Sequence, residues 1–146
     1  MRRQFIGALA LSALTPLALA QQTTAASAPT VRVVYHVADG IEQAQRALGN
    51  MRNHLLAEPG HKLVLVALSG GIDFLLEGAR DTYGNPFDAR IAWLAQQGVE
   101  FKVCNNTLRN MKLDPSKLVL EAKLVTSGVA EIARLQAREQ YVYIRP

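Results

Sequence analysis

Short apolar runs alternate with amphipathic stretches along most of the chain. The run at 31–37 is rich in β-branched side chains, and the run at 63–68 is continuously apolar, as is typical of a strand covered on both faces of a parallel sheet. We expect an amphipathic helix between them, opened by a capping box from Asp39 to Glu42 and closed before Pro59. Its apolar stripe recurs at helical spacing: Ile41, Ala44, Leu48, Met51 and Leu55.

The second half of the chain repeats this alternation. It predicts three more strands, at 99–104, 122–126 and 141–144. It also predicts a helical piece at 72–79, a helix from Asn85 to Gly98 and a helix of two turns from Asn105 to Lys112. A turn at Asp114 follows. The last helix starts at Ser127, and its side chains Val129, Ile132 and Leu135 are expected to face the core. Strands that alternate with helices favour βαβ units with right-handed crossovers, and therefore one parallel sheet with helices on both faces.

Residues 1–20 are expected to be a signal peptide. Arg2 and Arg3 precede an apolar stretch that ends in an A-x-A cleavage signal at Ala20, and export by either the general or the twin-arginine route fits this pattern. The stretch is shorter than the about 20 apolar residues that span a bilayer, so we expect cleavage and a periplasmic or secreted chain without a membrane partner. Residues 21–30 then form a flexible lead-in to a single domain at 31–146.

Removal of the signal peptide changes the charge of the chain. The sequence holds 16 Lys and Arg against 12 Asp and Glu, a net charge of +4. Two of the arginines and none of the acids lie in residues 1–20, so the mature chain carries 14 basic residues against 12 acidic ones, or +2. No basic run or aromatic–basic stripe accompanies this balance, and we expect no nucleic-acid partner.

The only cysteine, Cys104, is the strongest chemical candidate. It ends the strand at 99–104 and precedes the helix-starting group Asn105-Asn106-Thr107. A helix N-terminus favours the thiolate, the form that attacks, accepts sulfur or binds metal, so we expect a lowered pKa and partial exposure. Arg109 and Lys102 are the nearest cations that could lower the pKa further. A lone cysteine also often serves only as packing, and the spacing alone favours neither interpretation.

Other candidate binding residues are expected at the same edge of the sheet, because ligands of open parallel sheets bind beyond the carboxyl ends of the strands. Those ends carry His36, Ser69, Gly70, Gly71, Asn105, Asn106, Thr107, Ser127 and Gly128. Each of these residues also has a simpler structural explanation. His36 can be a hydrogen-bonded histidine at a strand end, and the glycine pair can make a turn instead of cradling an anion. Asp39 and Ser127 can be helix caps.

Common enzyme and metal motifs do not occur in the sequence. It has no phosphate loop, no dinucleotide fingerprint and no nucleophile elbow. His54 and His61 flank a Pro-Gly turn and do not share a helical face, as paired metal ligands on one helix would. We therefore expect no metal and no organic cofactor.

Three segments together resemble the DsrE/DsrF-like sulfur-relay family: residues 99–108, residues 127–136 and the chain end at 141–146. The strand with His36 and the loop at 68–71 fit the resemblance as well. It implies a single three-layer α/β sandwich, with a mostly parallel five-stranded sheet and helices on both faces, that assembles into homo-oligomers such as trimers or hexamers. It also implies that Cys104 carries sulfur as a persulfide.

Two functions follow from these observations. The first is an exported sulfur carrier that accepts sulfane sulfur on Cys104 from a donor protein and passes it to an acceptor protein, with His36 assisting proton movement if it reaches the site. The alternative is a non-catalytic periplasmic module that binds a small anion or a partner, with Cys104 as packing. Both describe a carrier or binding protein rather than a turnover enzyme.

Overall fold

The computed structural model describes residues 30–146, so the expected signal peptide and nearly all of the lead-in lie outside the described residues. Five strands form one all-parallel sheet in the order β4-β3-β2-β1-β5. They are β1 (Arg32–Val37), β2 (Lys62–Ala67), β3 (Glu100–Cys104), β4 (Ala122–Val125) and β5 (Val142–Ile144). Each lies within one residue of its predicted bounds, and the predicted α/β fold class is confirmed.

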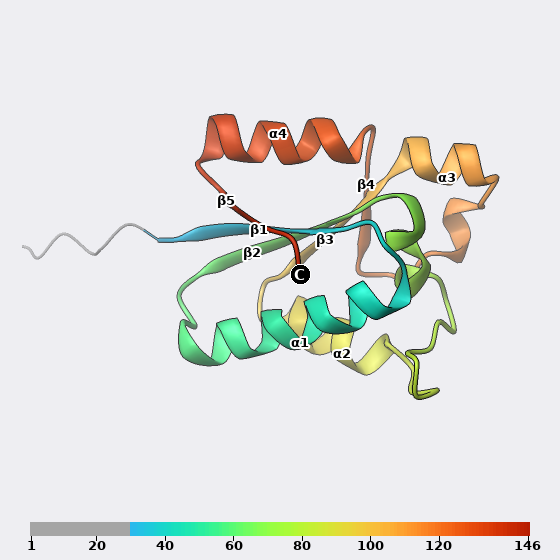
Figure 1. The fold of residues 1–146 in the computed structure, drawn as a ribbon, viewed down its shortest axis with the longest axis horizontal. Coiled ribbons are helices and arrows are strands. Elements are labelled where there is room, and N and C mark those ends of the chain that lie inside the picture. The colour runs from blue at the N-terminus through green and yellow to red at the C-terminus, as the bar shows by residue number, and fades with distance from the viewer. Residues whose placement is uncertain (1–29) are drawn as a thin grey trace, which may run out of the picture.

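Helices cover both faces of the sheet, which gives the three layers of the predicted sandwich (Figure 1). On one face lie α1 (Ile41–Ala57) and α2 (Asp88–Gln96), and on the other lies α4 (Gly128–Glu139). The helix α3 (Asn105–Met111) follows β3 directly, and two short 3-10 helices, η1 (Ser69–Leu75) and η2 (Pro115–Lys117), complete the connections. Within the described part, no helix has the length and apolarity to cross a membrane.

The continuous apolar run of β2 is explained by burial on both of its faces. Leu63 and Leu65 point into the larger core under α1 and α2, whereas Val64 and Val66 point into a smaller core under α4. Three phenylalanines meet edge to face in the larger core: Phe74, Phe87 and Phe101. The smaller core receives only Ile132 and Leu135 from α4 as fully buried side chains.

A largely buried ion pair also holds α4 on the sheet, where only a small apolar core lies beneath the helix. Lys102 of β3 donates to Glu131 at 2.6 Å, and the two side chains are 14% and 11% exposed. Hydrogen bonds from Arg134 and then from Lys102 outweigh burial and lower the pKa of Glu131 to about 2. Glu131 is also bound by Arg134 at 2.8 Å, so this carboxylate keeps a cationic partner if Lys102 is lost.

The structure corrects two local predictions in α1 and α4. Val129 is 63% exposed, because the face of α4 toward the sheet carries Gly128, Ile132 and Leu135 at helical spacing. The capping box at Asp39 is absent: Gly40 is the N-cap of α1, no side chain caps it, and the Asp39 carboxylate instead binds Arg145 at 2.8 Å.

The start of α2 also differs from the prediction. The helix begins at Asp88 after Phe87, not at Asn85-Pro86, and it ends at Gln96, two residues before Gly98. The backbone N–H of Asn85 binds the carboxylate of Asp81 at 2.9 Å and so belongs to the preceding turn. The helical piece predicted at 72–79 is the 3-10 helix η1, which starts earlier, at Ser69, and ends earlier, at Leu75.

Candidate functional site

The helices α3 and α4 begin near each other at the end of β3 (Figure 1), and the first residue of α4, Gly128, lies against Cys104. Cys104 ends β3 and is the N-cap residue of α3, as the sequence predicts. Its side chain faces α4, because Lys102, two residues earlier on the same strand, pairs in register with Val66 of the smaller core. The start of α4 lies against this junction, and the N–H of Asn106 donates to Thr126 just before α4, at 3.3 Å.

Uncharged donors from both helices stabilise the thiolate. Burial on its own raises the pKa of Cys104, but hydrogen bonds from the N–H of Gly128, the hydroxyl and N–H of Thr107, and the N–H of Asn106 outweigh burial and lower the pKa overall. The predicted cations take other partners: Arg109 donates to the amide oxygen of Asn106, and Lys102 binds Glu131. The predicted lowering of the pKa is therefore confirmed in direction: N–H groups of the first turn of α3 contribute, as expected, Gly128 of α4 adds to them, and the predicted cations do not contribute.

Thr107 connects the cysteine to the loop after β2. Its side chain is buried, and its hydroxyl oxygen accepts the N–H of Ser69 at 3.0 Å. The same hydroxyl is one of the groups that lower the pKa of the Cys104 thiol. Ser69 holds a left-handed backbone, with φ 50°, which is uncommon outside glycine and often accompanies functional sites.

The prediction of partial exposure for Cys104 is wrong, since the residue is only 6% exposed. The cause is the close approach of α4. A Cβ added to Gly128 would lie 2.9 Å from the Leu68 side chain and 3.2 Å from the Cβ of Cys104. Only a glycine therefore allows the first turn of α4 to bring its N–H to the sulfur without displacing Leu68.

Close packing of the backbone explains Gly71 in the glycine pair after β2, whereas a Cβ on Gly70 would make only ordinary contacts. A Cβ on Gly71 would lie 2.2 Å from the carbonyl oxygen of Val37, and a Cβ on Gly70 would lie 3.6 Å from that of Ala38. The N–H of Gly71 already donates to Ala38 at 3.1 Å. The structure thus supports the turn rather than the anion cradle for Gly71.

His36 does not reach Cys104. It pairs in register with Val66, which pairs with Lys102, so Cys104 lies two strands away and two residues further along, at roughly 12 Å by strand geometry. The Nδ1 of His36 instead hydrogen-bonds the hydroxyl of Tyr143 at 2.7 Å. Burial first, and then the charge of Arg145, lower the pKa of His36, which leaves it neutral at pH 7.

The remaining candidates occupy the helix starts. Ser127 caps α4 through its hydroxyl oxygen, which accepts the N–H of Ala130 at 3.4 Å, as predicted. Asn105 is the first residue of α3 and lies half-buried. The structure therefore gathers Asn106, Thr107 and Gly128 at the sulfur, with Ser69 behind Thr107.

A pair of histidines that the sequence argument set aside is in direct contact. The Nε2 of His54 lies 2.8 Å from the Nδ1 of His61, and the hydroxyl of Tyr35 lies 2.9 Å from the Nδ1 of His54. The turn at Pro59 folds the end of α1 back to the start of β2. This Pro-Gly turn is visible in the sequence and could have indicated the contact between the two histidines. No cluster of three or more metal-ligating side chains occurs among residues 30–146.

Comparison with known proteins identifies the family. The model of the DsrE/DsrF-like family matches residues 12–146. The chain belongs to the DsrE/DsrF-like family. This family is associated with sulfur relay. No curated protein is significantly similar to the chain.

Two solved structures are similar to this DsrE-like chain. One is MTH1491 of Methanobacterium thermoautotrophicum, described as a protein of unknown function, with 33% identity, a TM-score of 0.69, and coverage of 80% of this chain and 99% of that chain. The other is the ychN protein of E. coli, with 18% identity, a TM-score of 0.64, and coverage of 80% and 98%. The second likeness shows the fold alone.

Replacement of Thr107 tests the donor arrangement around Cys104. We expect Thr107→Val to raise the pKa of Cys104 by about one unit or more, because a hydrogen bond to a charged group contributes about 1.5–3 kcal/mol and one unit corresponds to about 1.4 kcal/mol. Thr107→Ser keeps the hydroxyl and should shift the pKa much less. The measurement is the pH dependence of Cys104 alkylation by iodoacetamide in the folded protein. Equal profiles for the two variants would contradict the assigned role of the hydroxyl.

Proposed function

We propose that this protein is an exported sulfur carrier that accepts sulfane sulfur as a persulfide on Cys104. The observation that carries the proposal is the convergence of donors from α3 and α4 on the sulfur, which favours the thiolate. The thiolate, not the thiol, is the attacking form of cysteine. Membership of a family associated with sulfur relay supports the same function.

The transfer needs no metal or organic cofactor. With thiosulfate as donor, the Cys104 thiolate attacks the outer, sulfane sulfur; a sulfur–sulfur bond forms, the bond to the sulfonate sulfur breaks, and sulfite leaves with the electron pair. The product is a persulfide anion, whose negative charge the same N–H groups can stabilise. An acceptor thiolate then attacks the outer sulfur, and Cys104 leaves again as the thiolate.

The burial of Cys104 favours a second candidate function. A cysteine residue that is 6% exposed in the single chain can also be packing in a module that binds a small anion or a partner through the same edge. The two functions differ in whether a small donor reaches the sulfur of the folded protein.

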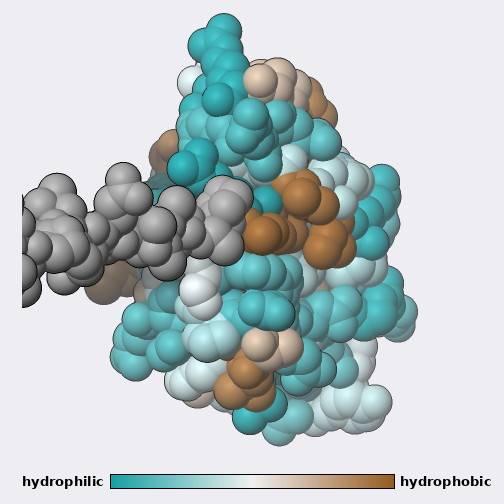
Figure 2. Space-filling view, turned by 90° about the vertical axis from the view of Figure 1, so that its left-hand side faces the viewer, coloured by the Kyte–Doolittle hydropathy of each residue, from teal (hydrophilic) through white to brown (hydrophobic). Residues whose placement is uncertain are grey.

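Self-association and export complete the proposal. Both edge strands, β4 and β5, leave one side of their backbone unpaired, which favours pairing or burial against another chain. Val142 of β5 and the neighbouring Val31 are exposed, and Figure 2 shows apolar surface where the described part of the chain begins. We propose a homo-oligomer, a trimer or a hexamer, in the periplasm or outside the cell, with separate sulfur donor and acceptor proteins.

Sulfur loading is tested by intact-mass measurement. After exposure of the folded protein to thiosulfate or polysulfide, we expect a gain of one sulfur, about 32 mass units, that a reductant removes. Cys104→Ser is the matched control and should show no reducible gain. A wild-type protein that stays unmodified while folded, and reacts only when unfolded, would overturn the carrier and leave the binding module.

Export and assembly are tested together by native mass spectrometry of the protein recovered from the periplasmic fraction. We expect subunits that begin at Gln21, because the cleavage signal ends at Ala20, and complexes of three or six subunits. An intact subunit that begins at Met1 would contradict export with cleavage. A monomer at micromolar concentration would contradict the homo-oligomer.

A further inference from the structure

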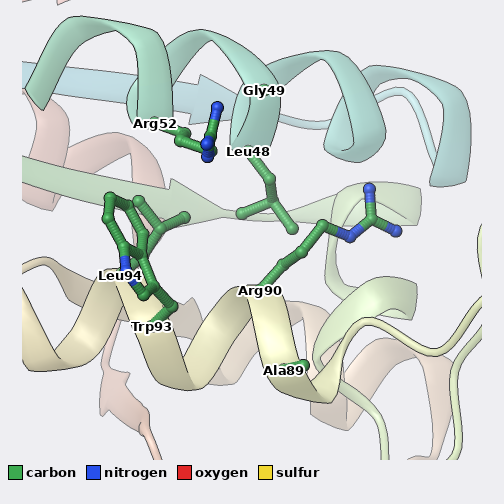
Figure 3. Close-up of a pocket in the computed structure, with 7 residues that line it drawn as sticks. All are labelled: Leu48, Gly49, Arg52, Ala89, Arg90, Trp93 and Leu94. Atoms are coloured by element: carbon green, nitrogen blue, oxygen red, sulfur yellow. The ribbon is translucent and has the colours of Figure 1, made fainter. Parts of the chain in front are cut away.

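We propose that the cavity between α1 and α2 binds a small organic anion with an apolar body, such as an alkyl or aryl carboxylate. The cavity holds about 390 Å³, within the usual range for small-molecule sites. It lies on the face of the sheet opposite to Cys104, so it is independent of the proposed sulfur chemistry. Seven residues line it (Figure 3): Leu48, Gly49, Arg52, Ala89, Arg90, Trp93 and Leu94.

The apolar part of the cavity comes from both helices. Leu48 of α1 and Leu94 of α2 belong to the larger core and form its base. The indole of Trp93 rises from α2 toward α1 and forms one wall (Figure 3). A flat indole beside two leucines offers an apolar or aromatic body a surface for burial and stacking.

The two arginines of the cavity have different roles. The guanidinium of Arg90 binds the buried carboxylate of Asp81 at 2.8 Å and lies 4.7 Å from the centre of the Phe87 ring. Figure 3 shows this guanidinium turned away from Trp93, so that Arg90 lines the cavity with its aliphatic stem. Its charge is thus already compensated within the fold.

Arg52 supplies a positive charge at the exposed rim of the cavity that no acidic side chain of the described residues pairs with. None of the ion pairs between residues 30–146 involves Arg52, and no acidic residue lines the cavity. An anion beside the guanidinium gains a charge-assisted hydrogen bond, which a neutral ligand does not gain. Charge complementarity therefore selects an anionic head group over an apolar base.

Gly49 shows that the α1 wall is left open. A glycine inside a helix is about 1 kcal/mol less favourable than alanine. No packing within the described structure requires it, because an added Cβ would meet no atom within 4 Å and its φ is not positive. The missing side chain does, however, leave room in the cavity beside Arg52. We infer that Gly49 serves the ligand and not the stability of the helix.

The experiment uses the fluorescence of Trp93, the only tryptophan in the chain, which reports directly on this cavity. Octanoate is the probe, added to the mature protein. We expect a saturable change in emission, and an affinity at least about tenfold lower for 1-octanol and for octanoate with Arg52→Gln, because each loses the charge-assisted bond. Arg46→Gln removes the same charge from α1 outside the cavity and should leave the affinity unchanged.

A second pair of variants separates binding from folding. Gly49→Ala should keep or raise the melting temperature, and Gly49→Leu, which fills the cavity, should abolish the octanoate response while the protein stays folded. Absence of a saturable response in the wild type would overturn the proposal. Equal affinity for octanoate and 1-octanol, or equal effects of Arg52→Gln and Arg46→Gln, would also overturn it, since the occupant would then be apolar rather than anionic.

Discussion

The close approach of the first turn of α4 to the end of β3 is the constraint on which the site depends. A side chain at Gly128 would displace Leu68 and crowd Cys104, and the N–H of Gly128 contributes most among the hydrogen bonds that lower the pKa of Cys104. The ion pair between Lys102 and Glu131, one turn further along α4, holds the helix in this place. The helix α4 crosses the sheet from β4 to β5. The contact between its first turn and Cys104 therefore depends on the strand order, and this contact in turn affects the protonation of the thiol.

Neutral donors are better suited to a sulfur carrier than a fixed cation would be. An attacking thiol works best with a pKa near the ambient pH, because its nucleophilicity falls as its pKa falls. At Cys104, burial opposes the donors, and both nearby cations are held by other groups, Arg109 by Asn106 and Lys102 by Glu131. The thiolate is favoured without an ion pair, which the sulfur transfer proposed above would otherwise have to break.

Local sequence patterns were sufficient to predict the helices and strands. The features that were predicted wrongly depend on contacts between residues that are far apart in the sequence. Hydrophobic periodicity was sufficient for the five strands and for the junction at Cys104, because it reports local burial. The predicted helix cap at Asp39 is absent because the Asp39 carboxylate instead binds Arg145, near the C-terminal end of the chain. The predicted exposure of Cys104 was wrong because α4 covers this residue. The distance between Cys104 and His36 follows from the order of the strands in the sheet, which local sequence patterns do not contain.

The central claim is that this convergence of helix starts stabilises the Cys104 thiolate, and the most direct test is its titration. Cys104 is the only cysteine, so thiolate absorbance in the ultraviolet, corrected for tyrosine with Cys104→Ser, reports on it alone. The account predicts a lower midpoint in the folded protein than in the protein unfolded by urea. A folded midpoint equal to or above the unfolded one would show that burial outweighs the donors and would contradict the account.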